Sequence, residues 1–256
     1  ASVSLARMLN MLPVGMIAQA AAVASFPFLA RLVAGGQALE ADRLTTRSLR
    51  TTVAVSLGAG ALVFAASRPV VRIVYQWGAF DQADSEVVAH LLSVLALSIP
   101  AWGIHQIIGR WFYAHRRMWM PVLIGTIATG VAIPLTWILA ERNGAAGIAV
   151  ASTIALWAYT AALALMWSRG VEGQGSGLLD ALLRGLIPAA LAAVAGRWVV
   201  ERLPVNGWLV SVLTAIVTGV VVLIVYLGLA RIFRFAEADP RTWMRRGSVT
   251  DRLIER

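Results

Sequence analysis

A stripe of polar and small side chains follows one face of the apolar segment 87–113. If the segment is helical, at about 100° per residue, six side chains fall within about 100° of one another: Ser98, Trp102, His105, Gln106, Gly109 and Tyr113. Such a stripe either packs against neighbouring helices or forms the wall of a hydrated cavity that binds a polar ligand. The stripe alone is compatible with both.

Two arginines in apolar surroundings are candidates for holding an anion. Arg7 comes just before Pro13, and Arg110 lies one turn inside the end of the segment 87–113. Arginine can hold a phosphate through two parallel hydrogen bonds, although an arginine near a span end also snorkels to the membrane surface. Asn10 lies on roughly the same helical face as Arg7. The candidate substrate-binding residues are therefore Arg7, Asn10, Ser98, His105, Gln106, Arg110 and Tyr113.

Residues for catalysis or metal binding are few. The apolar stretches hold no Asp or Glu except near their ends, the chain has no Cys, and its 3 His form no cluster. These absences disfavour a metal site, a thiol nucleophile and a relay of intramembrane carboxylates. We expect a non-enzymatic protein without metal, cofactor or nucleic-acid partner.

The composition predicts the elements that position these residues. Hydrophobic residues make up 59% of the chain and charged residues 14%, against about 25% charged in a soluble domain. Because a spanning helix needs roughly 20 apolar residues, we expect an all-α, polytopic transmembrane helix bundle with about seven spans. The expected spans are 12–32, 51–67, 87–113, 118–140, 145–167, 181–200 and 207–230.

The arginines predict the orientation of these spans. All 22 basic residues are Arg, and with seven spans 16 fall on one side and 6 on the other. Cytoplasmic loops carry the excess of positive charge, so we expect a cytoplasmic C-terminus. Anionic headgroups or an anionic substrate would also attract this charge.

Breaks in composition divide the chain. We expect five spans in 1–169, a Gly/Ser linker at 170–180, two additional spans in 181–230 and a cytoplasmic basic tail at 231–256. The segment 37–50, QALEADRLTTRSLR, could form a short interfacial helix. Because the chain opens without an initiator Met, we expect that an N-terminal part of a longer protein precedes it.

Several motifs occur in order along residues 1 to 170. They include GAFD at 78–81, then Asp84, Pro100, Ala101 and Gly103, Phe112 to Ala114, and Pro121. LPVGMIAQAAAVASFPFLARL at 12–32 and GAAGIAVASTIALWAYTAALAL at 144–165 accompany them. Together these segments resemble the MurJ (MviN) family of lipid II flippases, in the multidrug/oligosaccharidyl-lipid/polysaccharide exporter superfamily.

The resemblance implies a two-lobed bundle whose central cationic cavity opens alternately to either face of the bacterial cytoplasmic membrane. Its substrate would be an anionic lipid-linked glycan, a polyprenyl-pyrophosphate-linked peptidoglycan precursor. Residues 1–169 would form most of the second lobe, and 181–230 the two extra helices whose groove takes the lipid tail. Membrane lipids and cell-wall synthesis proteins are the implied partners.

Two departures from the family pattern keep alternatives open. Arg7 lies six residues before Pro13, where the family arginine usually lies five before, and the span 118–140 lacks the expected asparagines. The alternatives are a flippase for another lipid-linked polysaccharide and a non-transporting membrane scaffold of the cell-wall machinery.

Overall fold

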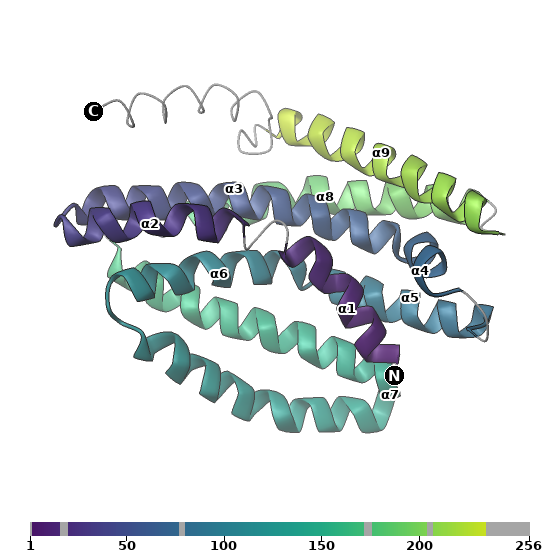
Figure 1. Ribbon diagram of the computed structural model, residues 1–256, viewed down its shortest axis with the longest axis horizontal. Helices are drawn as coiled ribbons and strands as arrows, with labels where there is room; N and C mark the ends of the chain where they lie inside the picture. The colour runs from purple at the N-terminus through teal and green to yellow at the C-terminus, as the bar shows by residue number, and fades with distance from the viewer. Residues whose placement is uncertain (1, 16–19, 77–79, 172–175, 204–206, 234–256) are drawn as a thin grey trace.

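The computed structural model describes residues 2–15, 20–76, 80–171, 176–203 and 207–233, and all regular structure within them is helical (Figure 1). The predicted all-α class is therefore confirmed. The helices are α1 (Ser2–Val14), α2 (Ala20–Ala34), α3 (Ala38–Ala65), α4 (Ser67–Tyr75), α5 (Gln82–Ala96), α6 (Ile99–Ala114), α7 (Trp119–Gly170), α8 (Ser176–Arg202) and α9 (Trp208–Ile232).

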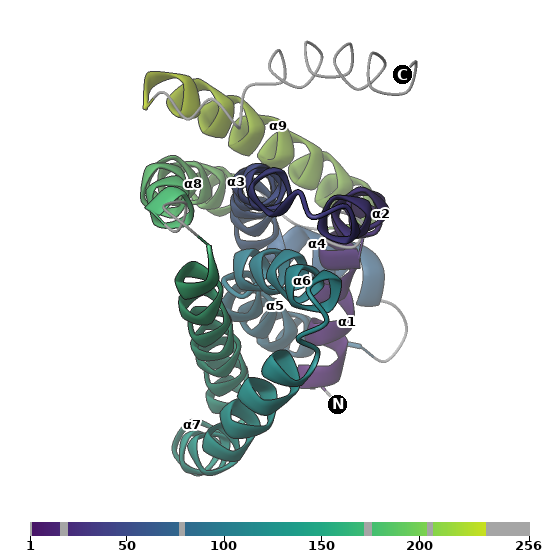
Figure 2. The same cartoon turned by 90° about the vertical axis from the view of Figure 1, so that its left-hand side faces the viewer.

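The helices are stacked in layers with α3 near the centre. From top to bottom, Figures 1 and 2 show α9, then α3 with α2 and α8, then α5 and α6 with α1, and last the two arms of α7. The largest core cluster joins α3, α6, α8 and α9 through buried residues such as Leu49, Ile108 and Tyr226. A second cluster joins α1 to α5 through Leu9 and Leu92.

Close approach of two helices explains why residue 103 of this core is a glycine. A Cβ at Gly103 would lie 2.8 Å from Thr52 Cγ2, so any larger residue would push α6 away from α3. Small residues let helix backbones approach in membranes, where van der Waals packing is a main driving force. The Gly103 contact therefore fixes the distance between α3 and α6.

Four helices are long and apolar enough to cross a membrane, or five if α5 and α6 form one bent span, counted over the described residues. The 52-residue helix α7 turns back on itself at Gly144, which has φ 56° and ψ −133°. Each of its arms is about as long as α9, so α7 supplies the two spans predicted at 118–140 and 145–167. With α7 counted as two spans, the described helices give five spans, or six if α5 and α6 form one, which is close to the predicted seven.

The segment 87–113, predicted as one helix, is two. The structure ends α5 at Ala96 and starts α6 at Ile99, with a bend of 42° between them. Pro100 has no N–H to offer Ala96 one turn earlier, and its ring disfavours a continuous helix there. The segment expected as one span is thus a bent pair of helices, with the bend next to Pro100.

Two predictions near the N-terminus also need correction. The span 12–32 is divided between α1 and α2, and residues 16–19 between them lie outside the described residues. The segment 37–50 is not a separate interfacial helix but, from Ala38 on, the first part of α3. Its polar side chains are used in packing, because Asp42 accepts from Trp111 Nε1 at 2.8 Å and Arg50 lies 3.6 Å from Asp180.

Other boundaries differ in detail. Helix α4 was not predicted; Arg72, on its buried face, donates to Glu86 at 3.0 Å. Asp81 of the GAFD motif caps α5, accepting from the Asp84 N–H at 2.8 Å. Helix α8 begins at Ser176, inside the predicted linker, while 172–175 and the tail from 234 on lie outside the described residues.

Candidate functional site

A cavity of about 550 Å³ lies between α1, the break from α5 to α6, and both arms of α7. Most of its wall is apolar, and Arg7 is the one charged residue among those that line it. The polar or aromatic residues of the wall are Arg7, Asn10, Ser98, Trp102, Thr129, Ser152 and Tyr159.

Hydrogen bonds join the helices around this cavity. Arg7 Nη2 donates to Ser152 Oγ at 3.3 Å, which links α1 to the second arm of α7. Asn10 Nδ2 donates to Ser98 Oγ at 3.4 Å, and that hydroxyl donates in turn to Leu95 O at 2.6 Å. Helix α1 is thus attached to the break between α5 and α6.

One polar group at the cavity is accessible to a ligand. Arg7 is exposed, and its guanidinium carries five N–H donors, of which one is directed at Ser152. Asn10 is only 1% exposed, and its Oδ1 is buried without a hydrogen-bond partner among the described residues. The wall therefore offers a cationic donor suited to an anionic group, while Asn10 serves to attach α1.

An aromatic cluster borders the same cavity. The ring of His105 lies 4.8 Å from that of Trp102 and 5.6 Å from that of Tyr159, measured between centroids. His105 Nδ1 is 3.2 Å from Ala101 O, and because a carbonyl only accepts, this contact requires the proton on Nδ1. Trp102 and Tyr159 line the cavity, and His105 packs behind them.

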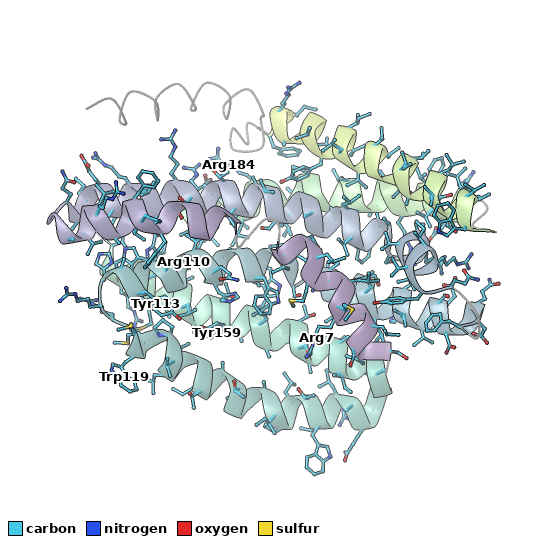
Figure 3. All side chains as sticks on the ribbon, viewed as in Figure 1. Arg7, Arg110, Tyr113, Trp119, Tyr159 and Arg184 are labelled. Carbon is cyan, nitrogen blue, oxygen red and sulfur yellow. The ribbon has the colours of Figure 1, made fainter. Side chains whose placement is uncertain are left out.

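The seven candidate residues fall into two groups. Arg7, Asn10 and Ser98 line the cavity, and His105 contacts it through its aromatic neighbours. Gln106, Arg110 and Tyr113 are not among the lining residues. Figure 3 shows Arg110 and Tyr113 toward the left-hand end of the bundle, away from Arg7. Arg110 stands over the Phe26 ring at 5.9 Å, and the Tyr113 side chain is 47% exposed.

The sequence reasoning missed the contribution of α7. It named no candidate residue in the span 145–167, whereas Ser152 and Tyr159 line the cavity and Arg7 donates to Ser152. Their spacing of seven residues, which places two side chains on one helical face, was the available signal. Within the described residues, no three His, Cys, Asp or Glu side chains are grouped so that they could hold a metal ion.

A family model described as "Lipid II flippase MurJ" matches residues 1–219. The chain belongs to the MurJ family. It is 33% identical over 186 residues to a probable lipid II flippase MurJ of Rhizobium meliloti (strain 1021), covering 72% of this chain and 35% of that protein. To the Rhizobium tropici MurJ it is 30% identical over 150 residues, covering 57% and 27% of the two chains.

Solved structures agree with this membership at the level of the fold. The chain is similar to a lipid II flippase MurJ in an inward closed conformation, with a TM-score of 0.67 and 20% sequence identity. The match covers 88% of this chain and 46% of the other. The chain therefore spans about a third of the length of the curated MurJ relatives and about half of the solved one. Membership in the MurJ family, together with the apolar helices, makes the chain part of a multi-pass membrane protein.

Proposed function

We propose that this chain is the C-terminal part of a flippase that moves lipid II, a polyprenyl-pyrophosphate-linked peptidoglycan precursor, across the bacterial cytoplasmic membrane by alternating access. Its relatives are named as lipid II flippases, which are transporters rather than catalysts. The observation that carries the proposal is the cavity of about 550 Å³ with a single arginine in an otherwise uncharged wall.

Arg7 would compensate the charge of the pyrophosphate, whose desolvation is the main physical obstacle to this transport. A pyrophosphate loses its hydration when it enters a low-dielectric bundle, and several kcal/mol are lost unless an opposite charge compensates. A guanidinium can hold two phosphate oxygens at once. The hydroxyls of Ser98, Thr129 and Ser152 in the same wall supply polar partners for the sugar and peptide groups that follow.

The orientation of the bundle is part of the proposal. Helices α2 and α6 end at the left in Figure 1, α3 and α8 end at the right, and α9 runs from the right toward the left and ends above the middle of the bundle. Arg31, Arg116, Arg117 and Arg169 lie at the left-hand helix ends, the side to which the sequence assigns the larger share of Arg. By the positive-inside rule this end, and with it the C-terminus, faces the cytoplasm.

A second cavity fits the lipid tail. An apolar groove of about 240 Å³ lies between α3 and α9, lined by residues that include Leu62, Leu223 and Leu227. At its edge the Tyr226 hydroxyl donates to Ala54 O at 2.6 Å, so the one polar group of that ring is satisfied. We propose that α8 and α9 are accessory helices, and that the groove between α9 and α3 holds a part of the prenyl chain while the head group crosses.

Binding of two lipids tests the assignment of Arg7. In the full reading frame, Arg7→Ala should weaken binding of a polyprenyl pyrophosphate about tenfold, or about 1.4 kcal/mol, because a charge-assisted contact is lost. Binding of the uncharged polyprenol should not change. Native mass spectrometry in detergent measures both.

The matched control is Arg197→Ala, which removes an arginine of α8 that pairs with Glu201 at 3.3 Å. It should bind the pyrophosphate like the unmodified protein. Equal pyrophosphate binding by Arg7→Ala and Arg197→Ala would remove Arg7 from the site. A protein that binds the lipid but never moves it would favour the scaffold alternative.

A further inference from the structure

The second arm of α7 donates three side-chain hydrogen bonds to the backbone around the break between α5 and α6. Trp157 Nε1 donates to Leu97 O at 2.9 Å, and Thr160 Oγ1 to Ala101 O at 3.2 Å. Thr153 Oγ1 lies 3.4 Å from Val94 O and 3.0 Å from Ala149 O of its own helix, so it is shared between the two.

The donors on α7 and the acceptors on α5 and α6 are regularly spaced along their segments. The donors follow one another by four and three residues, which places them on one face of α7, and the acceptors at 94, 97 and 101 do the same on α5 and α6. The separation along the chain is 59, 60 and 59 residues. The two segments therefore run in the same direction with one constant offset.

A break inside an apolar bundle needs such donors. Backbone carbonyls in a membrane must be satisfied internally, because no water is available to them. Pro100 supplies no N–H, so the carbonyl of Ala96, one turn earlier, has no helical donor and the backbone cannot continue as one regular helix. The indole of Trp157 and the hydroxyl of Thr160 supply hydrogen bonds from outside the helix.

The break in turn shapes the cavity. Ser98 lies within it and Trp102 follows one turn later, and both line the cavity together with Leu95. Ser98 is also where Asn10 attaches α1. On the same arm of α7, Ser152, Leu156 and Tyr159 form part of the opposite wall.

We propose that Trp157 and Thr160, assisted by Thr153, are positioning residues that hold the 42° bend and thereby set the cavity wall at Ser98 and Trp102. If their donors are lost, Leu97 O can regain a partner only from an N–H of its own span, which favours a straighter helix. The inference concerns this bend and rests on the proposed function only for what the cavity holds.

A distance between two spin labels tests the bend directly. Residues 1–256 contain no Cys, so cysteines are introduced at Val87, which is 49% exposed on α5, and at Arg117, just after α6, in a full-length protein from which any other cysteine has been removed. In the full-length protein in lipid nanodiscs, Trp157→Phe with Thr160→Val should lengthen this distance by about 2 to 3 Å, from the rise of 1.5 Å per residue and loss of the bend.

The control pair removes the same two donor types from the first arm of α7. Trp137 donates to Glu141 and Thr126 to Val122 O, both within that arm, so Trp137→Phe with Thr126→Val should leave the distance unchanged. Thr160→Ser, which keeps the hydroxyl, should reverse the part of the change that is due to Thr160→Val when it takes the place of that substitution.

An unchanged distance in a folded double variant would overturn the proposal, as would an equal change in the control. If the double variant does not fold, the single variants Trp157→Phe and Thr160→Val are measured separately. Each should lengthen the distance between the labels by a smaller amount. No substrate is present in this measurement, so its outcome is independent of the lipid-binding measurement that tests the proposed function.

Discussion

At the scale of the residue, Asn10 links two elements of the candidate site. Its amide group connects α1 to Ser98 at 3.4 Å, while its other end, Oδ1, is buried without a partner. A buried amide that loses its one hydrogen bond costs more than an amide removed altogether, because the desolvation penalty remains in the first case. The pair should therefore show strong non-additivity.

A double-mutant cycle tests this coupling. Ser98→Ala leaves Asn10 without a partner and should lower the free energy of unfolding by about 1–3 kcal/mol. Adding Asn10→Leu should recover a large part of that loss, since the unpaired amide is gone. Reversible unfolding in detergent measures both. Additive effects of the two substitutions would show that the pair does not interact.

The polar stripe predicted from the sequence lies only partly at the cavity, and its role in binding stays a prediction. Ser98 and Trp102 line the cavity, and the His105 ring packs against Trp102. Gln106 and Tyr113 were assigned by the same angle count, but they are not among the lining residues. Angular spacing shows which side chains share a face; it does not show how far along the face a cavity extends.

At the scale of the element, the turn of α7 depends on two glycines. Gly144 has a positive φ of 56°, which favours glycine, and a Cβ at Gly147 would lie 1.8 Å from Leu139 O in the other arm. That carbonyl belongs to the backbone, so it cannot rotate away. The two arms therefore approach each other here as closely as a residue without a side chain allows.

Gly147→Ala should consequently separate the arms and lower the thermal unfolding temperature clearly. Gly130→Ala is the matched control, because a Cβ there meets nothing within 4 Å. That control should be neutral or stabilising by up to about 1 kcal/mol, since alanine favours the helix. If both variants melt at the same temperature, the arms are not in contact at Gly147.

Long apolar segments were predictable because hydropathy depends on composition alone. Helices α8 and α9 and both arms of α7 occupy the expected places. A kink near Pro100 was predictable from the missing N–H, but its hydrogen-bond partners were not, because they come from α7, some 60 residues later. Likewise, α3 extends through 38–50 because its polar side chains find partners on α6 and α8.

At the scale of the whole molecule, the proposed topology distributes charge unevenly between the two sides of the membrane. With seven spans, the sequence assigns 16 of its 22 Arg to one side and 6 to the other. Asymmetry of this kind orients a membrane protein during insertion. The orientation is therefore a property of the whole chain rather than of a single loop.

Labelling of intact cells tests this orientation. A cysteine at Gln82, at the start of α5, should react with a membrane-impermeant maleimide from outside. A cysteine at Arg117, between α6 and α7, should react only after the membrane is opened, because that connection lies at the Arg-rich end. The reverse pattern would invert the topology.

The most direct test of the account is the rate at which the full-length protein moves lipid II across a reconstituted bilayer. We predict that Arg7→Ala lowers this rate at least about tenfold, in line with the loss of one charge-assisted contact. Arg197→Ala, on the opposite side of the bundle from the cavity lining, should keep the unmodified rate. Equal rates for the two variants would contradict the role of the cavity in transport.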